Sequence, residues 1–232
     1  MIEAVFFDAG NTLLKPHPSM REICLDILRA HGIEADPERL ERGLEKSELH
    51  YEKRYWTDDT FWASEDEARR MWVELYAILA EELGVEDARG MGEVIYEEFG
   101  RGSRWALFDD VLPAMRSLKE MGVLMGIVSN WDARLSTLCL ELDLSPYLHF
   151  IISSACVGHI KPEPSIFRMA LRRAGVDASR ALHVGDHYYA DVLGSRGAGL
   201  TPVWLNRSGL PGNFDCLVIR SLAELPALLR GL

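Results

Sequence analysis

The chain has 232 residues, of which 48% are hydrophobic and 26% are charged, which is ordinary for a globular protein with one core domain and room for an insertion. Acidic residues outnumber basic ones by 36 to 25 and the net charge is -11, so we expect no nucleic-acid partner, because this charge repels a phosphate backbone. No apolar run approaches bilayer length, a strand pattern opens the sequence directly, and the four cysteines form no C-x-x-C pair. We therefore expect a cytoplasmic protein with no membrane partner, no signal peptide and no zinc cluster.

A short apolar segment at residues 4–7 leads into Asp8 and a turn that contains Gly10. Such a run predicts a buried strand of a parallel sheet. Asp8 then lies at the carboxyl end of the strand, where open α/β sheets bind their ligands. Taken alone, Asp8 is equally well explained as the first residue of a turn. The prolines of the following segment, residues 15–18, predict a break in regular structure and a hinge.

Residues 19–98 predict four helices and no strand. The apolar spacing of the first helix ends at Gly32, and the second opens on Asp36-Pro37, an N-cap followed by a proline in the first turn. The third opens on Ser64-x-x-Glu67, which has the form of a capping box. The fourth is expected over about residues 88–99.

From residue 105 onward, predicted helices and strands alternate. The helices are expected over about 110–121, 132–142, 164–174 and 190–198, with a last one after the capping box Ser221-x-x-Glu224. The strands are expected at 123–128, 150–152, 181–184, 202–205 and 217–219. This alternation predicts a doubly wound parallel sheet in a Rossmann-like, three-layer α/β/α domain. The helical block interrupts that domain after its first strand, so we expect a core of residues 1–15 and 103–232 and an inserted all-α bundle of residues 16–102.

Polar residues recur beyond the carboxyl ends of the predicted strands: Asp8, Ser129, Lys161, Asp186 and Asp191. Each has a plain structural explanation, such as a helix cap or a surface lysine, but together they predict one site at one edge of the sheet. Asp8 and Asp186 in a partly dry crevice would repel each other unless a cation lies between them. Oxygen ligands without a nearby histidine or cysteine set favour Mg²⁺.

Four motifs stand in a fixed order: Asp8-x-x-x-Thr12, Ser129-Asn130, Lys161-Pro162 and Gly185-Asp186-x-x-x-x-Asp191. This order resembles the haloacid dehalogenase-like (HAD) hydrolase superfamily over essentially the whole chain. The inserted helices are similar to the helical type-1 cap of that superfamily. Within it, residues 105–132 and 183–199 most resemble the branch of the rhythmically expressed protein-like hydrolases.

The resemblance implies an enzyme that acts on a small phosphorylated molecule, as a monomer or a homodimer. It implies that Asp8 is the nucleophile, which forms an aspartyl phosphate, with Ser129 and Lys161 as the other catalytic residues. It implies Mg²⁺ held by Asp8, the Gly10 backbone carbonyl and Asp186, with Asp191 as a further ligand or an acceptor behind them. The implied substrate-binding residues are Asn11, Thr12, Ser129, Asn130, Trp131 and Lys161.

Gly10 departs from the phosphatase pattern, in which the residue two after the nucleophile is a second aspartate that protonates the leaving group and activates water. Such acid–base help is worth about 10²–10⁴ in rate. One interpretation is a phosphohydrolase that is slow, uses an easy leaving group, or takes an acid/base from the insertion, for example His17. A 2-haloacid dehalogenase needs neither that acid nor a metal, although its fourth motif lacks a pair like Gly185-Asp186.

Two further interpretations remain. A phosphonate hydrolase would need a lysine of the insertion, either Lys46 or Lys53. A binding or regulatory protein on an enzyme fold would need no turnover. The aromatic residues of the insertion and its edge are expected to form mostly its own core, and Trp131 is the aromatic residue expected nearest the substrate. Those residues are Tyr51, Tyr55, Trp56, Trp62, Trp72, Tyr76 and Trp105.

Overall fold

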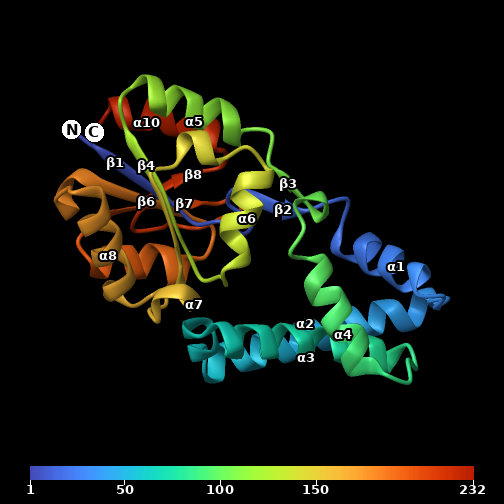
Figure 1. The fold of residues 1–232 in the computed structure, drawn as a ribbon. Coiled ribbons are helices and arrows are strands. Elements are labelled where there is room, and N and C mark those ends of the chain that lie inside the picture. Colours follow the sequence, from blue (N-terminus) through green and yellow to red (C-terminus); the bar gives the residue numbers. More distant parts are fainter.

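The computed structural model describes residues 1–232, and its centre is a six-stranded parallel sheet with the strand order β5-β4-β1-β6-β7-β8 (Figure 1). The strands are β1 (Ala4–Phe7), β4 (Leu124–Ser129), β5 (Phe150–Ser153), β6 (Ala181–Gly185), β7 (Thr201–Leu205) and β8 (Leu217–Ile219). The central strand β1 pairs with β4 on one side and β6 on the other. The chain order therefore reverses at β1, which confirms the predicted doubly wound sheet and makes the carboxyl end of β1 the switch point.

Helices cover both faces of the sheet (Figure 1). In β1, Val5 and Phe7 point to the face covered by α5 (Val111–Glu120), α6 (Arg134–Glu141) and α10 (Leu225–Arg230). The alternate residues Ala4 and Phe6 point to the face covered by α8 (Pro164–Ala174). All four side chains are fully buried, as expected for a strand that is covered on both sides. This burial fixes the register of β1 and so the position of the residue that follows it.

The helices inserted between β1 and β4 form a second core beside the sheet (Figure 1). They are α1 (Met20–Ala30), α2 (Pro37–Thr57), α3 (Glu65–Glu82) and α4 (Ala88–Glu98), with a 3₁₀ turn, η1 (Thr60–Ala63). Asp36 caps α2 by accepting from the Arg39 backbone N–H. The capping box predicted at Ser64 is wrong: the Ser64 side chain makes no cap hydrogen bond, and three acidic residues in the first turn favour that end of α3 instead.

The prediction that residues 15–18 break regular structure is wrong for residues 15 and 16 and holds for residues 17 and 18. Strand β2 (Leu14–Pro16) pairs antiparallel with β3 (Trp105–Leu107), so the segments that leave and re-enter the sheet domain run side by side. Pro16 is tolerated because it ends a two-stranded ribbon, where its missing N–H need not enter a ladder. A main-chain hydrogen bond from the His17 N–H to the Arg104 carbonyl (2.9 Å) continues the pairing.

The carboxyl-terminal half follows the predicted alternation, with two local differences. The segment expected as one helix over 190–198 is a π-helical turn, η5 (Tyr188–Leu193), followed by α9 (Gly194–Gly197). A short helix, α7 (Ser154–Val157), follows β5 directly. The capping box at Ser221 is present and opens η6 (Leu222–Glu224), which leads into α10. No helix of the chain is long and apolar enough to cross a membrane.

Candidate active site

Asp8 follows β1 directly, between the ends of the two neighbouring strands. Its Oδ1 accepts a hydrogen bond from Ser129 Oγ (2.9 Å), the last residue of β4, and one from Lys161 Nζ (2.5 Å). All three side chains are buried. None of these hydrogen bonds involves Oδ2, which leaves that oxygen free to act on a ligand.

Lys161 bridges two carboxylates. Its Nζ also donates to Asp191 Oδ1 at 2.6 Å. Burial alone would lower the pKa of Lys161, but the Asp191 and Asp8 carboxylates raise it above its ordinary value. The Asn130 side chain fixes the lysine by accepting from the Lys161 N–H (2.8 Å) and donating to the Lys161 carbonyl (3.0 Å). The ammonium is therefore charged and fixed in position.

Asp191 acts as the partner of Lys161. Its Oδ1 accepts from Lys161 and from His183 Nε2 (2.9 Å), and its Oδ2 accepts from the His187 backbone N–H (3.0 Å). Burial raises the pKa of Asp191, but the Lys161 and His183 contacts outweigh it and bring the pKa well below its ordinary value. Both carboxylate oxygens of Asp191 already accept hydrogen bonds. The geometry therefore favours a role for Asp191 in positioning Lys161 over a role as a metal ligand.

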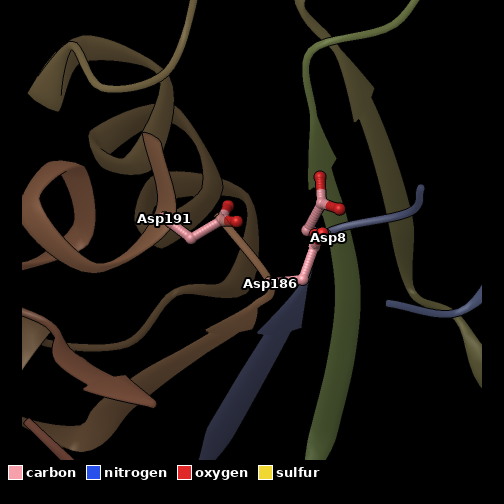
Figure 2. A group of neighbouring side chains, drawn as sticks. All are labelled: Asp8, Asp186 and Asp191. Carbon is pink, nitrogen blue, oxygen red and sulfur yellow. The ribbon is translucent and has the colours of Figure 1, made fainter. Parts of the chain in front are cut away.

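Asp186 is the carboxylate whose negative charge is offset least by other groups of the protein. Its one side-chain partner is Thr12 Oγ1, at 3.3 Å. Burial and the neighbouring charges of Asp8 and Asp191 raise the pKa of Asp186 to about 7. Figure 2 shows the three carboxylates converging at the end of β1, and an oxygen of each lies within 4.8 Å of the others.

This donor set fits a hard divalent cation. Three carboxylates face one lysine charge, so a cation between Asp8 and Asp186 would offset the repulsion that raises the Asp186 pKa. Oxygen-only donors of this kind suit Mg²⁺, which keeps several of its waters. The sequence therefore supplies the chemistry of a magnesium site at the switch point of the sheet.

Gly10 lies beside an indole ring. A Cβ added at Gly10 would lie 3.3 Å from Cζ3 of Trp131, which is tighter than an ordinary van der Waals contact. The Trp131 ring packs edge-on against Trp105, with 5.2 Å between the centroids. A side chain at position 10 would therefore need the Trp131 ring to shift by a few tenths of an ångström.

A cavity of about 110 Å³ opens over Asp8, Lys161 and Asp186. The helical insertion contributes Tyr51, Tyr55 and Trp62 to its wall. Burial raises the pKa of Tyr51 to about 12, and it also raises the pKa of Tyr55. The Tyr55 hydroxyl is buried and has no hydrogen-bond partner, which is unusual for a polar group.

A family model for haloacid dehalogenase-like hydrolases matches residues 2–199. The chain belongs to this family. The haloacid dehalogenase-like hydrolase domain-containing protein 3 of Danio rerio is 32% identical over 97% of this chain and 96% of its own. The phosphoserine phosphatase of Thermus thermophilus is 26% identical over 90% of this chain and 91% of its own. The crystal structure of a 2-haloacid dehalogenase from Pseudomonas syringae is 27% identical over 100% and 99% of the two chains, with a TM-score of 0.69.

In this HAD-like hydrolase, several residues singled out from the sequence lie away from the cavity. Asn11, in left-handed backbone with φ of 54°, lines a neighbouring pocket that also contains Asp186. His17 is exposed, and neither it nor Lys53 lines the cavity. Lys46 pairs with Glu82 on the surface of the insertion. The structure therefore offers neither a proton donor at His17 nor a Schiff-base lysine at the site.

Three contributors to the site of this HAD-like hydrolase were missed or undervalued in the sequence. His183 lies buried in β6 and supports Asp191, and His187 lines the cavity beside Asp186. A histidine inside a strand that leads to a Gly-Asp pair was an available signal for His183. The tyrosines of α2 were expected to be mostly core, because helical spacing identifies a buried face without showing what covers it.

Proposed function

We propose that this HAD-like hydrolase is a Mg²⁺-dependent phosphohydrolase that acts through an aspartyl phosphate on Asp8. The observation that carries the proposal is Asp186, a half-buried carboxylate beside the nucleophile whose negative charge is offset by no cationic side chain of its own. A site that displaces halide has no need of a cation there. The similarity to a bacterial phosphoserine phosphatase over 90% of the chain supports the same reaction class.

The chain's own residues account for the first chemical step. A carboxylate nucleophile needs no general base, so the free Oδ2 of Asp8 can attack phosphorus directly. Lys161 and Ser129 hold Oδ1 and aim the other oxygen, and the lysine charge stabilises the charge on the transferring group. Mg²⁺ held by Asp8, Asp186 and the Gly10 carbonyl would offset the repulsion between the carboxylates and an incoming phosphate. The tyrosines and Trp62 of the insertion line the cavity beside the nucleophile.

The test is hydrolysis of p-nitrophenyl phosphate with Mg²⁺ or with EDTA, because the phenolate leaves without a proton. We expect metal-dependent turnover that is lost in Asp8→Asn, and a Mg²⁺ affinity, measured by calorimetry, that falls at least about tenfold in Asp186→Asn. Asp66→Asn, at an exposed position of α3, is the matched control and should behave as the parent. Turnover that ignores EDTA would contradict the proposal.

A 2-haloacid dehalogenase is the second candidate, favoured by Gly10 and by the similarity to the Pseudomonas syringae enzyme. Halide leaves without protonation, so the absence of an acid at position 10 has no consequence for that reaction. Chloride release from 2-chloropropionate, run in parallel, decides between the two. Metal-independent chloride release would establish the dehalogenase, and the absence of both reactions would favour a binding or regulatory protein.

A further inference from the structure

Apart from Asp186, which the proposed Mg²⁺ would occupy, the acid–base groups around the cavity are already engaged within the protein. Lys161 is held between Asp8 and Asp191. His187 Nδ1 accepts a hydrogen bond from the Ala190 N–H (3.1 Å), so the proton of the neutral ring is on Nε2 and no lone pair remains to take a proton from water. None of these groups is available to activate a nucleophilic water.

The two phenols that line the cavity do not replace the missing acid. A general acid works best when its pKa is near the working pH, and burial moves the pKa of both Tyr51 and Tyr55 further above it. Both hydroxyls remain protonated and serve as hydrogen-bond donors. Gly10 itself has no side chain, and Trp131 lies 3.3 Å from where a Cβ would be. With Asp186 assigned to the cation, no side chain at position 10 and no phenol of the cavity wall supplies a proton to the leaving group.

We propose that the substrate is a small acyl phosphate, whose carboxylate leaving group departs without a proton, and that the aspartyl phosphate on Asp8 accumulates during turnover. This inference rests on the proposed phosphohydrolase function and narrows it to one substrate class. The structure supplies two matching features: a small cavity of about 110 Å³ and the unpartnered Tyr55 hydroxyl. An acyl phosphate brings a carbonyl oxygen that the Tyr55 hydroxyl binds.

The first transfer balances without acid catalysis. Asp8 Oδ2 forms a bond to phosphorus, the bond between phosphorus and the acyl oxygen breaks, and its electron pair leaves with the carboxylate. An alkyl phosphate would release an alkoxide, which needs a proton in the transition state. Acid–base catalysis is worth about 10²–10⁴, so this difference sets the expected preference for acyl over alkyl donors.

The second transfer lacks a base. Water attacks phosphorus, the bond between phosphorus and Asp8 breaks, its electrons return to the carboxylate, and the water proton passes to solvent or to the phosphate product. Because no side chain takes that proton, this step is slow relative to the first. The phosphorylated form of Asp8 is therefore the dominant species in the steady state.

The test compares acetyl phosphate with glycerol 3-phosphate in the presence of Mg²⁺, by phosphate release and by intact mass after acid quench. We expect kcat/KM at least about 10²-fold higher for acetyl phosphate, with most of the protein carrying one phosphoryl group during turnover. Hydroxylamine should remove that group, and Asp8→Asn should never acquire it. The Asp8→Asn sample also gives the rate of spontaneous acetyl phosphate hydrolysis.

Tyr55→Phe tests the acyl contact separately. We expect KM for acetyl phosphate to rise about tenfold more than KM for p-nitrophenyl phosphate, the value of one hydrogen bond, because the nitrophenyl ester has no carbonyl beside the phosphoryl group; an equal rise for both would contradict the acyl contact. Tyr147→Phe, remote from the cavity, is the matched control and should leave both values unchanged.

Two results would overturn the inference while leaving the phosphohydrolase intact: glycerol 3-phosphate turning over within tenfold of acetyl phosphate, or unlabelled protein during rapid turnover. Failure of the proposed function has a different signature. In that case no donor gives Mg²⁺-dependent phosphate release and none labels Asp8, and the inference fails with it.

Discussion

Replacement of Gly10 by aspartate tests directly whether the missing acid limits this enzyme. Gly10 does not have positive φ, so the backbone accepts a side chain. The obstacle is Trp131, whose Cζ3 would lie 3.3 Å from the new Cβ. The carboxylate of Gly10→Asp has to displace an indole ring that Trp105 supports from behind.

Two effects oppose each other in Gly10→Asp: a gain in rate from the new acid and a loss of stability from overpacking. A correctly placed acid would raise the rate by about 10²–10⁴. Overpacking costs about 1–3 kcal/mol, and each kcal/mol lowers Tm by about 2–4 °C in a chain of this size. We therefore expect Gly10→Asp alone to lower Tm by several degrees and to gain less than about tenfold in rate. The double variant Gly10→Asp/Trp131→Leu should gain about 10²-fold or more.

The assay is steady-state hydrolysis of glycerol 3-phosphate with Mg²⁺, because an alkoxide leaving group needs the acid. Trp131→Leu alone is the matched control and should show no gain. A hundredfold gain in Gly10→Asp with unchanged Tm would show that Trp131 does not block the position. A folded double variant with no gain would show that the absent acid is not what limits the rate.

Two other predictions concern charged contacts outside the cavity. Arg134 pairs with the fully buried Asp132 and donates to the Tyr96 carbonyl of α4 (2.6 Å). Arg134→Met should therefore lower the free energy of unfolding, measured in urea, by about 3 kcal/mol. The control Arg168→Met, at an exposed position, should leave it unchanged. Burial raises the pKa of Asp110, but hydrogen bonds from Arg207, among others, outweigh it and lower the pKa below its ordinary value. The stabilisation that the ionised Asp110 provides is present above about pH 4 and is lost as the pH falls through the lower pKa of the folded state. The difference in Tm between the parent and Asp110→Asn should therefore shrink below pH 4. A difference that stays constant with pH would contradict the assignment.

The sheet was predictable because its signals are local. A buried parallel strand is a short apolar run bounded by a turn, and β1 and β4 both have this form. The convergence of Asp8, Ser129 and Asp186 follows from one rule about the carboxyl ends of parallel strands. Residues far apart in the sequence could therefore be assigned to one site although the structure of the loops between them was not predicted.

The features that escaped prediction depend on tertiary neighbours. The ribbon of β2 and β3 consists of three-residue strands about ninety positions apart, so neither has a periodic signal of its own. Both a metal ligand and an acceptor behind the ligands were expected for Asp191, and the choice between them depends on hydrogen bonds from Lys161 and His183, which spacing does not encode. The ring of Trp131 follows Asn130 in the sequence, but its position beside Gly10 is fixed by packing against Trp105.

The two halves of the proposed chemistry depend on separate parts of this site, so on this proposal the absence of an aspartate at position 10 affects only one of them. Attack on phosphorus needs a fixed carboxylate and positive charge, and these come from Asp8, Ser129, Lys161 and the cation site at Asp186, none of which involves a side chain at position 10. Proton transfer needs a group with an accessible lone pair and a suitable pKa, and the one cavity residue of that kind, Asp186, is the carboxylate that the proposal assigns to the cation. On this proposal we expect the site to act on donors that bring their own good leaving group.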